Sequence, residues 1–371
     1  MTTRPVPISL LDRSRTRAGE PTALALHDTV ERARRAEELG FDRIWVAEHH
    51  AVPGIASGSP PLLMAAIAAR TARIRVGSGG VMLPNHRPIV VAEQAKMLAA
   101  LHPGRVDLGV GRSLGFTAPV RDALGVHDYG PDDFAGDVSA LADLLADAGP
   151  VTAMPKGVPA PPLFVLATGS GLAVAARLGL PVVVGGPLVH GDLTPLADYR
   201  AAFRPRHPDD GPRVLVSVDV LVADSPTRAR DLVLPEAWAM VESRTTGAFP
   251  PLRPEPALRL TARQQEQVEQ HLDQVGERRG VLERHGGVDV EEAAAVRAEL
   301  LDGLLRGDGT AGDHLRPPGE GRHRHLCAQR SLRRADRACG RRGRHPLSDA
   351  QFGKGGGGAR PAQPDRPSPL P

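Results

Sequence analysis

Short apolar runs alternate with amphipathic segments along the first 220 residues. The runs predict buried strands at residues 6–11, 41–47, 74–81, 106–110, 162–167, 181–184 and 214–222. Between them, apolar residues at helical spacing predict helices over residues 22–39, from residue 60 to 67, and over 90–101 and 172–178. Because strands and helices alternate strictly, we expect parallel strands joined by crossover helices.

Two architectures produce this alternation, the (β/α)₈ barrel and the doubly wound sheet. The alternating run has no linker and the barrel typically needs about 250 residues, which favours a TIM barrel, although periodicity alone does not separate the two. Residues 252–305 are rich in Arg, Glu and Gln and predict one or two surface helices, including 290–305. We therefore expect one α/β barrel domain over residues 1–305.

Composition narrows the class of protein. Of the 371 residues 41% are apolar and 24% are charged, which is close to a soluble globular average. No run approaches the roughly 18 apolar residues of a membrane span, and the N-terminus has no long apolar signal region. Only two cysteines occur, Cys327 and Cys339, which excludes a disulfide-stapled secreted scaffold. We expect a cytoplasmic protein without a membrane partner.

The composition changes at Arg306. Residues 306–371 hold 13 Arg, one Lys and six Asp or Glu, a net charge of +8, with twelve Gly, eight Pro and no Val or Ile. Such a segment buries too little apolar surface to offset chain entropy. It resembles a GC-rich coding region read out of frame, with a native disordered tail as the alternative. We expect no eighth barrel strand between Arg306 and Ala338, and hence a barrel whose last strand–helix unit is missing or damaged.

The remaining 305 residues carry a net charge of −5, so nucleic acid is not an expected partner. In the tail, His323, His325, Cys327 and Cys339 match no standard zinc spacing, and we expect no metal there.

The first candidate chemistry lies at the end of the second strand, in the run Glu48-His49-His50. The carboxyl ends of strands form the active-site face of a TIM barrel. Because successive strand side chains point in opposite directions, the two histidines are not expected to share a ligand. We expect no metal here, because no third ligand is spaced nearby. A histidine simply packed under a loop is the alternative.

Glycines follow the third strand, in Gly77-Ser78-Gly79-Gly80, where they permit close approach of a flat ligand or form a β-bulge. Arg112 follows the fourth strand, where a guanidinium can hold a phosphate. Thr168-Gly169-Ser170 precedes a helix, whose N-terminal N–H groups and neighbouring hydroxyls suit an anion, unless they only cap the helix. Together these residues predict a barrel mouth that binds a planar, phosphorylated cofactor.

Three of these segments resemble the luciferase-like flavin-dependent monooxygenases, in particular those of secondary metabolism: GFDRIWVAEHH (40–50), RIRVGSGGVMLPNHRPIVVAEQ (73–94) and LHPGRVDLGVGR (101–112). The resemblance implies a TIM barrel that uses reduced FMN, supplied by a separate flavin reductase, and O₂ to oxidise a small organic substrate. It implies an acid–base role for His49 and a non-prolyl cis peptide at or beside Gly79–Gly80. It also implies that the following residues bind the cofactor: Glu48, Ser78, Gly79, Gly80, Arg112, Thr168, Gly169 and Ser170.

The resemblance leaves alternatives open. Gly111 stands where the light-emitting luciferase subunit has cysteine, so light emission is not implied. The turn at 168–171 is shorter than the family's usual form, which leaves the phosphate ligands open. A deazaflavin-dependent oxidoreductase and a non-catalytic flavin-binding protein remain alternative functions, and a homodimer is left open.

Overall fold

The computed structural model describes residues 7–276, apart from residues 168, 187, 189–191, 220, 222, 224, 257 and 258, and it describes residues 325–329. Its strands are β1 (Ile8–Asp12), β2 (Arg43–Val46), β3 (Arg75–Ser78), β4 (Val81–Met82), β5 (Val106–Gly111), β6 (Leu163–Leu166), β7 (Val182–Val184), β8 (Val214–Asp219) and β9 (His325–Gln329). All of their pairings are parallel. Every strand predicted from the sequence is present, with the third split into β3 and β4.

The strands close into a ring, which confirms the barrel over the doubly wound sheet. In the order β3-β2-β1-β9-β8-β7-β6-β5-β4, β3 also pairs with β5, through Val76 with Val106 and Gly77 with Asp107. Since β4 continues β3 beyond Gly79–Gly80, the ring has the eight strand positions of a TIM barrel.

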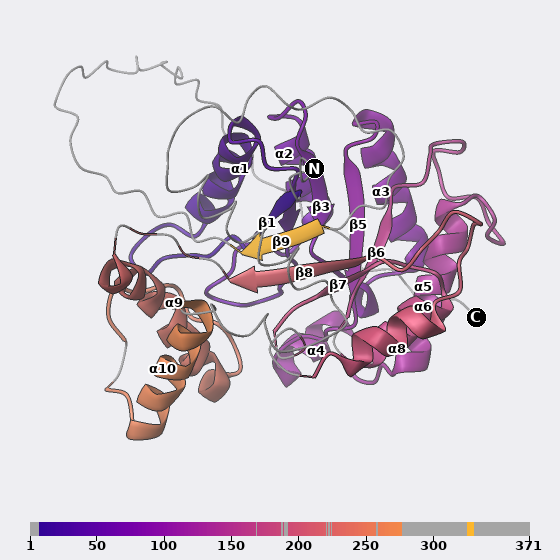
Figure 1. The fold of residues 1–371 in the computed structure, drawn as a ribbon. Coiled ribbons are helices and arrows are strands. Elements are labelled where there is room, and N and C mark those ends of the chain that lie inside the picture. Colours follow the sequence, from indigo (N-terminus) through magenta and orange to yellow (C-terminus); the bar gives the residue numbers. More distant parts are fainter. Residues whose placement is uncertain are drawn as a thin grey trace, which may run out of the picture. The chain divides into compact units, whose positions relative to one another are not determined.

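The expectation that no strand forms between Arg306 and Ala338 is wrong. β9 lies between β1 and β8 (Figure 1), with Leu326 opposite both Ile8 and Val216. The expectation came from the lack of β-branched side chains, but a strand between two others is held by backbone hydrogen bonds that any non-proline residue makes. The boundary at residue 306 and the disordered tail stay predictions, because residues 277–324 and 330–371 lie outside the described residues.

The described helices are α1 (Ala23–Glu38), α2 (Pro60–Ala68), η1 (Leu83–Asn85), α3 (Pro88–Leu101), α4 (Ala118–Leu124), α5 (Pro131–Leu145), α6 (Ser170–Arg177), α8 (Thr194–Ala202), α9 (Pro226–Thr246) and α10 (Ala262–Gly276). The four helices predicted from apolar spacing are α1, α2, α3 and α6, and the surface helix predicted after residue 252 is α10. Helices α4, α5, α8 and α9 were not predicted. The helix predicted at 290–305 lies outside the described residues. In the described part of the chain, no helix is long and apolar enough to cross a membrane.

A small apolar cluster around Trp45 fills the inside of the ring. The Trp45 side chain is 1% exposed and meets Phe164 edge to face, with 5.3 Å between ring centroids. The Arg43 guanidinium lies 5.0 Å from the Trp45 ring centroid and pairs with the buried Asp107. Larger apolar clusters lie between the strands and the surrounding helices. The ring is therefore filled by side chains, so a ligand site is expected at its mouth.

Candidate active site at the barrel mouth

Parallel strands end on one side of the ring, and the predicted site residues follow four of these ends. Glu48 to His50 follow β2, Gly79–Gly80 separates β3 from β4, Arg112 follows β5, and Gly169 follows β6. In the ring β2 pairs with β3, β3 with β5, and β5 with β6, so the four segments follow adjacent strands. Segments 30 to 60 residues apart in the sequence thus share the active-site face of the barrel.

The two adjacent histidines go to different neighbours, as expected, although both lie beyond the end of β2 and not in the strand itself. The His49 ring stacks on Phe116, with centroids 5.6 Å apart and planes at 27°. His49 Nδ1 is buried without a hydrogen-bond partner in the described structure. Burial, together with the charges of Arg13 and Arg15, lowers the pKa of His49 to about 4. The imidazole is therefore neutral at pH 7 and has a nitrogen that lacks a partner.

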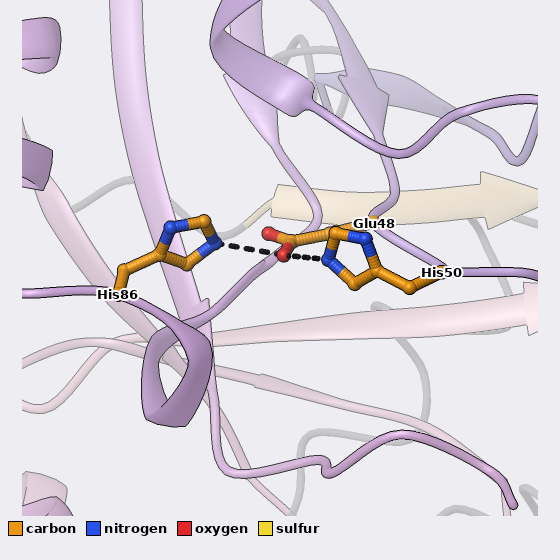
Figure 2. Close-up of side chains that lie close together, drawn as sticks. All are labelled: Glu48, His50 and His86. Carbon is orange, nitrogen blue, oxygen red and sulfur yellow. Dashed lines mark hydrogen bonds and ion pairs between the residues drawn. The ribbon is translucent and has the colours of Figure 1, made fainter. Parts of the chain in front are cut away.

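His50 instead joins a hydrogen-bonded cluster around Glu48 (Figure 2). Glu48 Oε1 lies 2.6 Å from His50 Nε2 and 2.8 Å from His86 Nε2, and Oε2 accepts from the Met82 backbone N–H at 2.9 Å. Burial alone would raise the pKa of Glu48, but these three contacts outweigh it and hold the pKa below its usual value. The carboxylate of Glu48 is thus ionised and engaged by the chain itself.

This cluster corrects one premise of the sequence analysis, which found no third donor near Glu48 and His50. His86 is that donor, and the donor atoms of the three residues lie within 4.8 Å of one another. It was missed because it follows the third predicted strand, 36 residues further along the chain. Adjacent parallel strands bring such distant segments together at their carboxyl ends.

The peptide bond between Gly79 and Gly80 is cis, as the resemblance implies. The space beside these glycines is already filled by the chain. A Cβ at Gly77 would lie 2.5 Å from the Trp45 ring, one at Gly79 would lie 2.9 Å from Leu11 Cδ1, and one at Gly80 would lie 2.9 Å from the Gly109 carbonyl oxygen. The glycine cluster therefore forms the break between β3 and β4 and makes room for Trp45, with or without a ligand.

Arg112 lies just beyond β5 and is exposed, and its charge is close enough to Tyr129 to act on that hydroxyl. On the adjacent strand, β6 leads to α6, with Gly169 at the N-cap in a conformation with φ of 66°. Gly169 and Ser170 are exposed. A cation and a helix N-terminus on neighbouring strand ends are both suited to an anion. Thr168 lies outside the described residues.

Sequence reasoning missed a group of residues that is linked to His49 through Phe116, Arg13 and Arg15. Glu236 of α9 receives Arg13 Nη2 at 2.5 Å and Arg15 Nε at 3.1 Å. Both guanidinium groups lie over the ring of Phe249, at 5.4 and 5.2 Å from its centroid. Phe249 meets Phe116 edge to face at 6.1 Å. The signal in the sequence was weak, because these residues come from three distant segments and match no motif.

A comparison with protein families decides the classification. The model of the luciferase-like monooxygenases matches residues 6–314. The chain belongs to this family. A relative described as a luciferase-like monooxygenase, from Escherichia coli (strain K12), is 37% identical over 261 residues, which cover 68% of this chain and 77% of the relative. The resemblance seen in the sequence is thereby confirmed.

Several solved structures are similar to this chain in fold. Apo-MsnO8 is 29% identical, with a TM-score of 0.64 and coverage of 87% of this chain and 93% of its own. The oxygenating constituent of 3,6-diketocamphane monooxygenase from Pseudomonas putida, in complex with FMN, is 19% identical (TM-score 0.53; 65% and 76% covered). An F420-dependent secondary alcohol dehydrogenase is 16% identical (TM-score 0.55; 88% and 93% covered). The latter two likenesses concern the fold alone.

Proposed function

We propose that this luciferase-like protein is a flavin-dependent monooxygenase that uses reduced FMN and O₂ to oxidise a small organic molecule. One observation carries the proposal: a neutral, half-buried histidine at the barrel mouth, His49, has a buried nitrogen without a partner in the described structure. An unsatisfied polar atom costs folding free energy, about 1–3 kcal/mol, so its retention favours a functional partner. FMN in the related barrel named above supports the choice of cofactor.

The residues at the mouth fit such a cofactor. Arg112 and the α6 N-terminus offer a cation and N–H groups to a phosphate, on adjacent strand ends. The Gly79–Gly80 segment and His49 would hold the flavin ring. Glu48 and Ser78 would contribute by fixing this segment, since their polar atoms are bonded within the chain. Reduced FMN, when bound, supplies the electrons with which O₂ is activated.

The chain's own groups then position and protect the reacting atoms. His49 is neutral at pH 7, so its imidazole offers a reacting group one N–H donor and one acceptor nitrogen, through which a proton can be given and taken up. Phe116 stacks on His49 and Phe249 packs on Phe116, which keeps water from this side of the imidazole. The partner protein would be a flavin reductase that delivers the reduced cofactor, and the cytoplasm would be the compartment.

A direct test compares cofactors. The purified chain is titrated with FMN, reduced FMN and reduced deazaflavin, and O₂ consumption is followed with a flavin reductase present. We expect reduced FMN to bind best and O₂ consumption to exceed that of the reductase alone once a substrate is supplied. If reduced FMN binds but O₂ consumption stays equal to that of the reductase alone, the chain is a flavin-binding protein without monooxygenase activity.

A second candidate is an oxidoreductase that uses a deazaflavin. The observation that favours it is the shared fold of an F420-dependent secondary alcohol dehydrogenase. Preferential binding of the deazaflavin, and hydride transfer without O₂, would support this candidate over the monooxygenase.

A further inference from the structure

We propose that Glu48, His50 and His86 form a binding site for a divalent transition-metal ion such as Zn²⁺. The three side chains converge from two separate segments, the loop after β2 and the residue after η1 (Figure 2). Their donor atoms lie within 4.8 Å of one another, and this is the one such group among the described residues. The proposal does not depend on the flavin chemistry.

The donor set is suited to such an ion. Two imidazole nitrogens and one carboxylate oxygen, with open positions for water, are the ligands of catalytic zinc sites and of non-haem iron sites. The second oxygen of Glu48 accepts the Met82 backbone N–H at 2.9 Å. A ligating carboxylate is commonly oriented by an outer hydrogen bond of this kind.

Charge and burial also favour a cation here. The Glu48 side chain is 0% exposed, and within the described structure its only ion-pair partners are the two histidines, with no Lys or Arg. Burying a carboxylate without a permanent positive partner is costly. The imidazoles of His50 and His86 are 23% and 28% exposed, so an ion can enter from solvent and keep a water ligand.

The distances show what binding requires. The two O···N separations of 2.6 and 2.8 Å are hydrogen-bond lengths. Two ligand atoms around tetrahedral Zn²⁺, at bonds of about 2.0–2.1 Å, lie about 3.3 Å apart. The imidazoles would therefore move outward by about half an ångström, and the ion would replace the shared protons. Partly exposed rings can make this shift, whereas Glu48 is held by Met82.

Bound metal would join the segment after β2 to the segment after β4. These two segments flank the Gly79–Gly80 bond of the barrel mouth. His49 would not take part, since its ring is stacked on Phe116. We expect the ion to stabilise the mouth, because any ligand that binds only the folded state raises its stability.

The test is metal uptake by the full chain, read without flavin. The protein is treated with chelator, dialysed and titrated with Zn²⁺ by calorimetry, in a Cys327→Ser, Cys339→Ser background that removes both cysteine thiols of the chain. We expect one equivalent of Zn²⁺ to bind with a micromolar or lower Kd and to raise Tm. Co²⁺ is expected to bind in the same ratio, with the visible absorption of a low-symmetry site.

Matched variants locate the ion. Glu48→Gln keeps an oxygen for both imidazoles but loses the anionic ligand, and His86→Ala removes a partly exposed ligand that the core does not need. Each is expected to weaken Zn²⁺ binding at least tenfold. His127→Ala is the control, since His127 faces Asp122 at 3.4 Å outside the cluster. A parent chain that takes up no Zn²⁺, or folded variants that titrate like the parent, would show that the cluster is a hydrogen-bonded unit only.

Discussion

The Ser78 side chain holds both backbone polar groups of Gly109, across two adjacent barrel strands. Ser78 Oγ donates to the Gly109 carbonyl oxygen at 2.8 Å and accepts the Gly109 N–H at 2.9 Å. The two backbones approach so closely that a Cβ on Gly109 would lie 2.3 Å from the Ser78 carbonyl oxygen and 2.9 Å from Leu166 Cδ1. Gly109 is therefore required by packing between β3 and β5.

Gly109→Ala is expected to lower the free energy of unfolding by about 3 kcal/mol, because overpacking against backbone costs about 1–3 kcal/mol or more. Denaturant unfolding measures the loss. Gly136→Ala is the matched control: Gly136 lies inside α5, and an added Cβ there would have nothing within 4 Å, so alanine should stabilise by about 0.5–1 kcal/mol. Equal stability of both variants would contradict this account of Gly109.

The sequence was sufficient for the elements whose apolar pattern is regular. Buried parallel strands show as short apolar runs, and α1 and α3 show a clear helical spacing. Helix α9 was missed because charged residues and an internal Pro235 interrupt its pattern. The strand β9 was missed because its place depends on the unpaired edges of β1 and β8 rather than on its own side chains.

The site residues, too, were only partly predictable from the sequence. Residues at strand ends, such as His49 and Arg112, were singled out by their position along the chain, and the role of His49 came from the resemblance to the family. Glu236 and Phe249 were not found, because the tertiary fold, and not any local spacing, brings them to Arg15 and Phe116. The third member of the Glu48 cluster, His86, was in a quoted motif, but only strand adjacency relates it to His50.

The strand β9 should make a measurable contribution to stability. Ala328 is opposite Leu10 and Val218, so its backbone N–H belongs to a ladder in the middle of the sheet. Ala328→Pro removes that donor and leaves a ladder carbonyl without a partner, which is expected to cost about 1–3 kcal/mol and to lower Tm. Ala328→Ser keeps the N–H and should unfold close to the parent. If the proline variant were as stable as the parent, β9 would have no role in closing the barrel.

Glu37 gives a pH dependence of stability with a defined sign. Its Oε1 accepts the backbone N–H groups of Ala72, Arg73 and Ile74, at 2.9, 2.5 and 2.9 Å. Burial is the largest single influence and opposes ionisation, but the three hydrogen bonds together outweigh it and hold the pKa of Glu37 below its usual value. The unfolded chain then binds a proton first, so this stabilisation is complete above about pH 4.5 and is lost as the pH falls through the folded pKa.

Glu37→Gln should therefore destabilise the protein at pH 7 and flatten the decline in stability below pH 4.5. Thermal unfolding from pH 3 to 7 measures both effects. The neighbouring Glu38→Gln is the control, because Glu38 pairs with Arg35 at the exposed end of α1. Parallel pH profiles for the parent and Glu37→Gln would contradict the assignment.

A variant of Arg112 tests whether this residue binds the phosphate of the proposed cofactor. FMN and riboflavin differ only by the phosphate, so Arg112→Ala should weaken FMN binding by about 10- to 100-fold and leave riboflavin binding within a few-fold. The range corresponds to a charge-assisted contact of about 1.5–3 kcal/mol. Fluorescence titration with both ligands makes the comparison, and Arg200→Ala, at an exposed position of α8, is the control. Equal losses for the two ligands would mean that Arg112 acts on structure and not on phosphate.

His49 is the residue on which the proposed chemistry depends most. If it transfers protons at the barrel mouth, His49→Ala should lower turnover by about 10²-fold and change flavin affinity by no more than a few-fold. His49→Asn keeps a polar side chain of similar reach that does not exchange protons near neutral pH, so it should be equally slow. Phe116→Leu removes the stacked ring but not the imidazole, and should reduce turnover less. Steady-state turnover and flavin titration on the three variants separate these effects, and a His49→Ala enzyme with unchanged turnover would remove His49 from the chemistry.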